Sequence, residues 1–352
     1  ICNLCNLQSL DVSMCWKLEK LPQGIGKLIN LRHLLLHVNP WEIRIKSFPK
    51  GIGRLTCLKT LGYFPVGKGE EICKLGELEH LNHIQGKLKI VGLSDVVDSG
   101  AIENTLKKKN HLRDLWLRFS TLEKKTEEEE ETEEERRRKM EKDVAILNAL
   151  EPPPCLEALL IIFYEGTIMY PNWMMSKLTY LKRLVIEFCP NLEQLPPLGK
   201  LPLLEELSID IAPMIRKVGD EFLGIDIEEE ELSESSKDII IFPNLKSLKF
   251  QYFDEWEEWS GMGGTIEEEE EKDNSANAFV TNNTPKIQIM PRLHSLEIEW
   301  CFNLKSLPDY LRNTPLKEFN IRECPILKQR CERGIGDYRI FQKITTKLKL
   351  FH

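Results

Sequence analysis

The sequence lacks the features that would place it in a membrane or in a common class of enzyme. No apolar run approaches the ~18 residues that a membrane-spanning helix needs. No GxSxG, HExxH, kinase or glycosidase motif is present, and the seven histidines are scattered along the chain. We therefore expect a soluble protein that is not an enzyme.

Two short motifs resemble ligand sites but are incomplete. Cys2 and Cys5 have the spacing of metal ligands, yet no second CxxC or HxxxH follows to complete four ligands. Residues 24–27 resemble the end of a phosphate-binding loop, but Leu28 stands where that loop needs Ser or Thr to reach magnesium. We expect no metal and no cofactor in this chain, and we interpret the glycines as turn residues.

Leucine is abundant and follows a pattern that neither a helix nor an alternating strand explains. In LKRLVIEFCPNLEQLP, residues 181–196, LxxLxL is followed three residues later by Cys189 and then by an irregular return. This arrangement is typical of one coil of a leucine-rich-repeat solenoid. The middle position of LxxLxL recurs eleven times, at Leu10, Leu34, Leu61, Leu88, Leu115, Leu159, Leu184, Leu207, Leu248, Leu296 and Phe319.

The repeats predict the fold, because one coil cannot cover its own apolar face and depends on the coils stacked on either side. We predict one leucine-rich-repeat domain over residues 1–352 with about eleven repeats. Its class is an α/β solenoid, a horseshoe with a concave parallel β-sheet and an irregular or short-helical convex side. Residues 1–7 align with residues 25–31, the return half of a coil, so we expect a fragment of a longer protein without a signal peptide here.

Three intervals between repeats are too long for one coil, and each contains an acidic run. We predict acidic or polar insert loops at residues 123–143, 226–238 and 261–285. Such runs repel themselves and bury nothing, so we expect disordered or frayed-helical loops. Their simplest role is solubility, and the alternative is regulation by lying against the basic coils or a partner. Nucleic-acid binding is disfavoured because the acidic loops would compete for the same cations.

Ten cysteines raise the question of a secreted disulfide scaffold, and their positions argue against it. Cys15, Cys189, Cys301 and Cys324 occupy the ninth place of LxxLxLxxC, where Asn39 stands in the second repeat. A side chain at this turn points inward, and cysteine suits the place as a small apolar residue with a weak S–H donor. We expect reduced, structural cysteines and a reducing compartment.

The residues between the leucines of LxxLxLxx point away from the core and tile the concave sheet. Aromatic residues beside arginine on such a face are typical of protein-binding hot spots. The alternative for these aromatics is packing against neighbouring strands within the sheet. The predicted partner-binding residues are Arg113, Trp116, Arg118, Phe119, Phe163, Tyr164, Lys182, Arg183, Glu187, Phe188, Lys249, Gln251, Tyr252, His294, Glu297, Glu299, Trp300 and Arg322.

Three segments carry a resemblance to a known family. They are LPQGIGKLINLRHL at 21–34, FPNLKSLKFQYFDEWEEW at 242–259 and CPILKQRC at 324–331. With them the chain resembles, over nearly its whole length, the leucine-rich-repeat region of plant intracellular immune receptors, the disease resistance proteins of the coiled-coil, nucleotide-binding, leucine-rich-repeat class.

The resemblance implies innate immunity by effector recognition. Its repeats would bind a pathogen effector or a guarded host protein, and would restrain an upstream nucleotide-binding switch that exchanges ADP for ATP and is absent from this chain. It also implies a cytoplasmic protein, with nuclear or membrane-peripheral pools as further locations. Two other classes stay open. A substrate adaptor of a ubiquitin ligase would carry an F-box-like segment upstream. A secreted inhibitor or receptor ectodomain would carry paired capping cysteines and several glycosylation sequons, whereas we find one, at 282–284.

Overall fold

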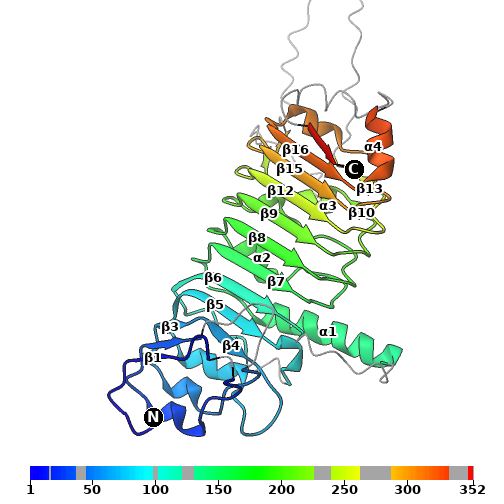
Figure 1. Cartoon of the computed structure of the whole chain (residues 1–352). Coiled ribbons are helices and arrows are strands. Elements are labelled where there is room, and N and C mark those ends of the chain that lie inside the picture. The colour runs from blue at the N-terminus through cyan, green and yellow to red at the C-terminus, as the bar shows by residue number, and fades with distance from the viewer. Residues whose placement is uncertain are drawn as a thin grey trace, which may run out of the picture.

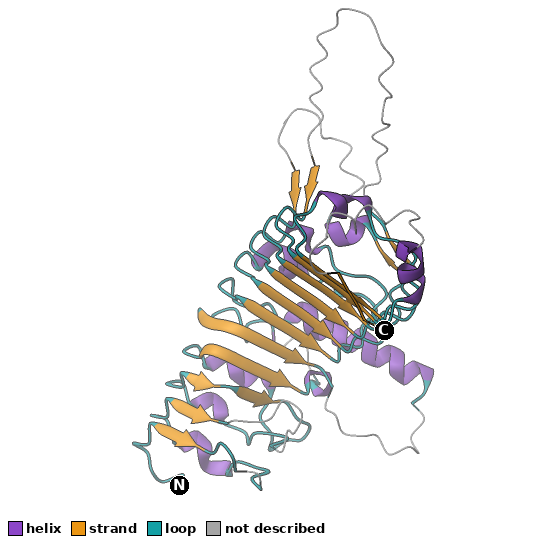
Figure 2. Cartoon of the chain, turned by 45° about the horizontal axis from the view of Figure 1, so that its top comes forward, coloured by secondary structure: helices purple, strands orange, loops and turns teal. Residues whose placement is uncertain are grey.

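The chain folds as a stack of short coils, most of which contribute one strand to a parallel sheet (Figure 1). This confirms the predicted leucine-rich-repeat solenoid. The strands of the two larger sheets form one layer, and the short helices and irregular segments lie behind it on the convex side (Figure 2). The computed structural model describes residues 1–15, 17–36, 45–97, 102–120, 131–225, 239–261, 287–332 and 348–351.

Two parallel sheets follow the stack in chain order. The first has three strands, β1 (Ser9–Asp11), β2 (His33–Leu35) and β3 (Thr60–Leu61). The second has ten strands, which are β4 (Tyr63–Pro65), β5 (Gln85–Val91), β6 (His111–Arg118), β7 (Ala158–Ile162), β8 (Arg183–Glu187), β9 (Glu206–Asp210), β12 (Ser247–Gln251), β15 (Ser295–Glu299), β16 (Glu318–Arg322) and β17 (Leu348–Phe351).

Shorter elements occupy the return segments of the coils. Two pairs of short parallel strands are β10 (Lys217–Val218) with β13 (Glu258–Trp259), and β11 (Ile239–Ile241) with β14 (Ile287–Ile289). The α-helices are α1 (Glu133–Ala149), α2 (Asn172–Lys177), α3 (Asp220–Leu223) and α4 (Pro325–Glu332). The 3-10 helices are η1 (Gln23–Lys27), η2 (Ile52–Arg54), η3 (Leu75–His80), η4 (Leu93–Asp95), η6 (Leu198–Lys200) and η7 (Asp309–Asn313).

The strand register matches the leucine pattern of the sequence. In the ten-stranded sheet the predicted marker residues lie opposite one another from Leu88 through Leu115 and onward to Phe319. In the three-stranded sheet Leu10, Leu34 and Leu61 do the same. A single periodicity therefore sets both the strands and their alignment.

The two sheets separate at Gly62. The sequence pattern does not predict this break between the sheets. β3 ends at Leu61, and β4 begins at Tyr63, which lies opposite Lys89 of β5. That pairing shifts the chain by one residue, because the marker Leu61 would otherwise lie opposite Leu88. The shift turns Tyr63 toward the outer face of the sheet, where its hydroxyl donates to the carbonyl of Ile45 at 3.1 Å.

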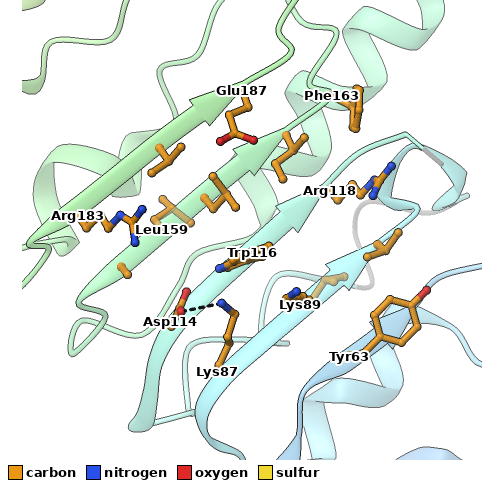
Figure 3. Close-up of a pocket in the computed structure, with 16 residues that line it drawn as sticks. Tyr63, Lys87, Lys89, Asp114, Trp116, Arg118, Leu159, Phe163, Arg183 and Glu187 are labelled. Carbon is orange, nitrogen blue, oxygen red and sulfur yellow. Dashed lines mark ion pairs between the residues drawn. The ribbon is translucent and has the colours of Figure 1, made fainter. Parts of the chain in front are cut away.

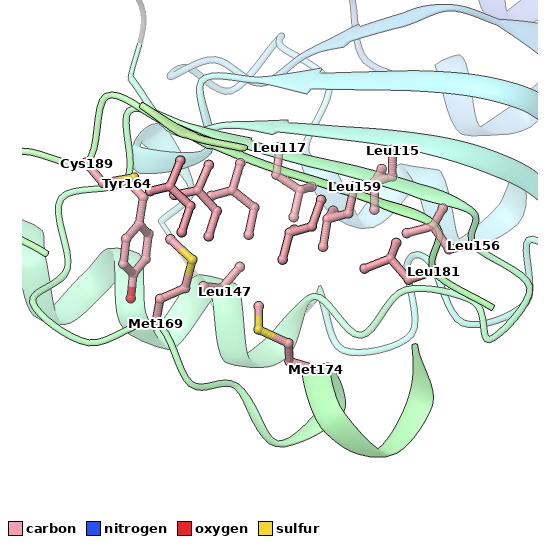
Figure 4. Close-up of a cluster of buried hydrophobic side chains, with 14 of the residues drawn as sticks. Leu115, Leu117, Leu147, Leu156, Leu159, Tyr164, Met169, Met174, Leu181 and Cys189 are labelled. Carbon is pink, nitrogen blue, oxygen red and sulfur yellow. The ribbon is translucent and has the colours of Figure 1, made fainter. Parts of the chain in front are cut away.

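The leucines of the strands point into one continuous core (Figure 4). Leu115, Leu159 and Leu184 are all but completely buried, and they share this core with Leu147 of α1 and Met174 of α2. Each such side chain contributes roughly 1.5–3 kcal/mol when it is fully enclosed. Since most of the enclosing atoms belong to adjacent coils, the stack stabilises each coil through its neighbours.

Most coils turn inward at the end of their strand through a residue with a left-handed backbone. This residue occupies the eighth place of LxxLxLxx, where bulky side chains rarely adopt a positive φ. The conformation costs roughly 1–2 kcal/mol per residue, so the packed coil must enforce it. It directs the following side chain, in the ninth place, into the core. The residues with this turn are Met14, Phe163, Phe188, Ile211, Tyr252, Trp300 and Glu323.

The ninth place holds the cysteines that were predicted to point inward. Cys189, Cys301 and Cys324 are buried, and the thiol of Cys324 donates to the carbonyl of Ile298 on the preceding coil at 3.6 Å. The prediction is wrong for Cys15, which is exposed. Its strand β1 lies at the edge of its sheet and therefore has a neighbouring coil on one side only.

The GIG segments are turns that let consecutive coils approach closely. The carboxylate of Glu77 in η3 accepts hydrogen bonds from the backbone N–H groups of Gly51 and Gly53, each at 2.9 Å. An anion-binding turn is thus filled by a side chain of the next coil. A Cβ added at Gly53 would lie 2.8 Å from the carbonyl oxygen of Glu77, so glycine is required there.

Helix α1 corrects the predicted insert loop at 123–143. Residues 133–143 are helical, and a capping box begins the helix: Glu135 N–H donates to the Thr132 hydroxyl at 3.3 Å, and Thr132 N–H donates to the Glu135 carboxylate at 2.9 Å. The glutamates of the first turn also stabilise the helix, because their negative charge lies at the positive end of the helix dipole. The other predicted insert residues, 123–130, 226–238 and 262–285, lie outside the described residues, as does Asn39.

A buried carboxylate holds α1 against the coils. Asp143 is fully buried and accepts hydrogen bonds from the Ser94 hydroxyl at 2.8 Å and the Glu165 N–H at 3.2 Å. Lys142 donates to the Ser94 carbonyl at 2.6 Å, and Lys139 pairs with Glu165. Burial raises the pKa of Asp143 to about 6 against the hydrogen bonds that lower it.

We predict that Gly53→Ala lowers the free energy of unfolding by roughly 1–3 kcal/mol, because the new methyl group pushes η2 away from the Glu77 backbone. Gly62→Ala is the matched control, since a Cβ there has no neighbour within 4 Å. Urea denaturation of both variants measures the difference. Equal losses would mean that the coils are not packed this closely.

A second prediction concerns pH. The raised pKa of Asp143 means that the folded chain keeps this proton between about pH 4 and 6, where the unfolded chain has released it. The contribution of Asp143 to stability should therefore be complete below pH 4 and be lost as the pH rises through 6, by on the order of 3 kcal/mol. Asn at this position does not titrate. Between pH 4 and pH 7 the wild type should therefore lose this amount of stability relative to Asp143→Asn, as measured by denaturation of both proteins at each pH. The exposed variant Asp309→Asn should follow the wild-type profile.

Candidate recognition surface on the concave sheet

Alternate side chains of each strand point away from the core, and the register aligns them into rows across the concave face. The central row is Tyr63, Lys89, Trp116, Leu160, Val185, Ser208, Lys249, Glu297 and Asn320. The outer row, nearer the carboxyl ends of the strands, is Val91, Arg118, Ile162, Glu187, Asp210, Gln251, Glu299 and Arg322.

A cleft of about 340 Å³, here called the concave cleft, lies over β4 to β8 (Figure 3). Its floor is apolar: Leu160, Ile162 and Val185 are each 8% exposed, and Trp116 packs against them. This small cluster lies on the opposite side of the sheet from the main core. The volume is at the lower end of the range for ligand pockets and is large enough for a few side chains of a partner.

Cations border the concave cleft and lie against its aromatic rings. The ammonium groups of Lys87 and Lys89 lie 3.7 and 4.0 Å from the centre of the Trp116 ring, and the Arg118 guanidinium lies 4.9 Å from that of Phe163. Burial, and then the charge of Lys87, lower the pKa of Lys89. These cation–π contacts hold the positive charges at the rim of the cleft, beside its apolar floor.

A second group of aromatic side chains lies over the C-terminal coils. The rings of Tyr252 and Trp300 stack with their centres 5.6 Å apart, and Phe302 meets Trp300 edge-on at 6.2 Å. Tyr252 and Phe302 are 39% and 41% exposed. Two stacked residues at the turn of adjacent coils thus present an accessible apolar surface.

Carboxylates dominate the outer row beyond β7. Glu187 lies opposite Asp210 on the next strand, and burial first, then the neighbouring carboxylate, raises the pKa of Glu187. Burial likewise raises the pKa of Asp210. Further along, Gln251 donates to Glu299, so this part of the surface is acidic.

The structure brings together five of the predicted binding residues around the concave cleft, namely Trp116, Arg118, Phe163, Arg183 and Glu187. Phe188 stacks on Phe163 with ring centres 4.8 Å apart. A second set of predicted residues lies on the C-terminal half of the face, and it comprises Lys249, Gln251, Tyr252, Glu297, Glu299, Trp300 and Arg322. That these residues bind a partner stays a prediction.

The prediction of a partner-binding role is wrong for two residues. Phe119 and Tyr164 are fully buried in the main core, where their rings meet edge-on at 5.1 Å. Tyr164 occupies the inward ninth place of its repeat, as Cys189 does in the next one. Phe119 stands at the eighth place, but its coil lacks the left-handed turn, so the strand alternation continues and points the ring inward.

Three predicted residues lie where the strands begin. Lys182 forms an ion pair with Glu157 at 2.8 Å, and Arg113 pairs with the same carboxylate at 3.5 Å. His294 is half-buried, and its backbone N–H donates to the backbone carbonyl of Lys246. Exposed ion pairs such as those of Glu157 contribute little to stability, but they link one coil to the next.

The leucine frame also contains functional candidates that the sequence analysis missed. Lys87 and Lys89 flank the marker Leu88, and Leu160, Val185 and Asp210 hold equivalent outward places on later strands. Their positions in LxxLxLxx are the signal that could have identified them.

Two further observations bear on ligand chemistry and membranes. Among the residues that the structure describes, no three His, Cys, Asp or Glu side chains are grouped so that they could hold a metal ion. Within the same residues, no helix has the length and apolarity that crossing a bilayer requires.

Comparisons with known proteins identify the family. The family described as R13L1/DRL21 LRRs matches residues 75–211. Disease resistance protein RGA2 of Solanum bulbocastanum is 32% identical over 284 residues, which are 79% of this chain and 27% of that protein. The chain is a leucine-rich-repeat region of the plant disease resistance protein type.

The resistance-protein assignment rests on more than one relative. RGA4 of the same species is 33% identical over 246 residues, which are 70% of this chain and 22% of that protein. The chain therefore spans about a quarter of the length of these curated relatives. Among solved structures, an internalin, inlF of Listeria monocytogenes, is similar at 12% identity and a TM-score of 0.43, covering 98% of this chain and 87% of that one.

The inward and outward positions of this resistance-protein repeat region can be tested with two phenylalanines. Phe119→Ala should lower the free energy of unfolding by about 3–5 kcal/mol, because it empties a buried site. Phe188→Ala should cost about 1–2 kcal/mol, because this ring is half-buried on the concave face and loses one stacking partner. Denaturant titration gives both values. A larger loss for Phe188→Ala would reverse the assignment of the two faces.

Proposed function

We propose that this repeat region recognises a pathogen effector, or a host protein that the effector modifies, on its concave face. The accessible aromatic pair Tyr252 and Trp300 carries this proposal, together with the concave cleft around Trp116. Aromatic side chains and arginine concentrate binding energy in protein interfaces. Membership of the resistance-protein family supports a role in plant defence.

The second part of the proposal is restraint of a switch. In the parent protein, one flank of the repeats holds an upstream nucleotide-binding domain in its ADP-bound state, and partner binding on the concave face releases it for exchange with ATP. The cytoplasm is the proposed location, with a protein effector or guarded protein and the parent's own nucleotide-binding domain as partners. Catalysis is not part of the proposed role of this chain.

A binding experiment tests the restraint. The purified 352-residue chain should associate at low salt with the purified nucleotide-binding fragment of its parent receptor, and more tightly when that fragment holds ADP than ATP. Trp116→Ala and Trp300→Ala should leave this association within twofold, because the flank makes the contact. No association at low salt would contradict autoinhibition.

A response experiment tests the recognition. In the full-length receptor, Trp116→Ala and Trp300→Ala should abolish the defence response to the cognate effector, whereas Tyr180→Ala, at an exposed tyrosine in the turn before β8, should retain it. A normal response from both tryptophan variants would contradict recognition on the concave face.

A further inference from the structure

The concave face changes the sign of its charge along its length. Lys87, Lys89 and Arg118 stand on β5 and β6, where Asp114 is the carboxylate among them and pairs with Lys87 at 3.2 Å. The outer row then presents carboxylates from β8 onward. The other nearby charges pair with each other, Arg183 with Glu206 at 3.5 Å and Lys249 with Glu297 at 3.0 Å.

One cation at this cationic end, Lys89, has no counter-ion of its own among the described residues. Its ammonium group instead lies against the Trp116 ring at 4.0 Å. This charge lines the same cleft as the apolar floor residues Leu160 and Val185, and Figure 3 shows Lys89 next to Trp116. A ligand group that suits both features carries a carboxylate beside a large apolar side chain.

The acidic end contains one carboxylate oxygen without a donor among the described residues. Asp210 Oδ1 is buried without a hydrogen-bond partner in the described part of the chain. Glu187 on the adjacent strand likewise makes no ion pair there, and Glu299 accepts from a neutral amide, that of Gln251. Asp210 and Glu187 are only half-buried, so a lysine or arginine of a partner can approach these carboxylates from the concave side and form charge-assisted hydrogen bonds there.

We propose that the concave face takes one protein segment with separated charges. Its acidic and apolar end occupies the concave cleft, and its basic end lies over Asp210 and Glu299. This inference rests on the proposed function for the existence of a protein partner and adds the chemistry and the orientation of that partner.

A polyanion does not fit the same surface. A nucleic acid strand that followed the sheet from Lys89 would meet a row of carboxylates within a few strands, and its phosphates would be repelled there. A protein segment can change its charge over that distance. The alternation of sign therefore favours a protein partner and also fixes its orientation.

Strand spacing sets the length of the segment. Neighbouring strands are roughly 4.8 Å apart, so Asp210 lies three strands, or about 14 Å, from Arg118 along the sheet. Glu299 lies two strands further, at about 24 Å. An extended chain covers about 3.3 Å per residue, so roughly four to seven residues separate the two ends of the segment.

Two synthetic peptides of identical composition test the proposal on the full chain. In the first, two aspartates flank tryptophan and leucine, four Ser and Gly residues follow, and two arginines end the peptide. In the second, each arginine is placed beside an aspartate. Fluorescence anisotropy should give at least tenfold tighter binding of the charge-separated peptide. A photo-crosslinker at its acidic end should label β5 to β8, and one at its basic end β9 to β15.

Variants assign the two ends. Lys89→Glu and Asp210→Asn should each weaken the charge-separated peptide at least fivefold, with Lys89→Gln as a milder second variant at the first position. Lys246→Glu is the control, because Lys246 pairs with Glu205 at 2.8 Å away from both rows, and it should change affinity less than twofold. Circular dichroism verifies that each variant is folded.

Three results would overturn the inference: equal affinity for the two peptides, no detectable binding of either, or competition by an oligothymidylate of twenty nucleotides at the concentration of the peptide. None of these results would bear on the association with the nucleotide-binding fragment or on the receptor response. Failure of the charge-separated partner and failure of the proposed function are therefore distinguishable.

Discussion

Every coil of this protein depends on the coils beside it to bury its leucines. A single LxxLxL strand has one apolar side and no second layer of its own, so Leu184 is enclosed only because Leu159 and Leu207 stand in register on either side. Close approach of the return segments, which Gly53 permits, keeps these layers in contact. The outward row of side chains is a consequence, because stacking that fills one face of the sheet leaves the other face open.

The turn at the end of each strand connects this packing to recognition. A residue with positive φ, such as Phe188 or Trp300, stays on the outer face while the next residue enters the core. The aromatic stacks of the concave face and the buried cysteines therefore arise from the same backbone feature. Where the turn is missing, as at Phe119, the aromatic side chain in the eighth place lies in the core and not on the concave face.

The leucine spacing was sufficient to predict the fold, the strand register and most outward positions, because burial is periodic in this fold. It failed where local conformation overrides the period. Tyr164 stands in the ninth place and could have been assigned to the core by analogy with Cys189. The Thr132–Glu135 capping box was also visible in the sequence, although charge composition alone favoured a loop. By contrast, the register shift at Gly62 depends on pairing between coils, and the charge division of the concave face depends on which residues share a row.

The inward and outward assignment is tested most directly by hydroxyl-radical footprinting of the folded chain, read by mass spectrometry. Tyr252, Phe302 and Tyr180 should be oxidised at rates near those in urea, because they are exposed. Phe119, Tyr164 and Trp256 should be protected at least tenfold, because no part of their rings reaches solvent. Oxidation of the second set as fast as the first would contradict a continuous core behind an open sheet.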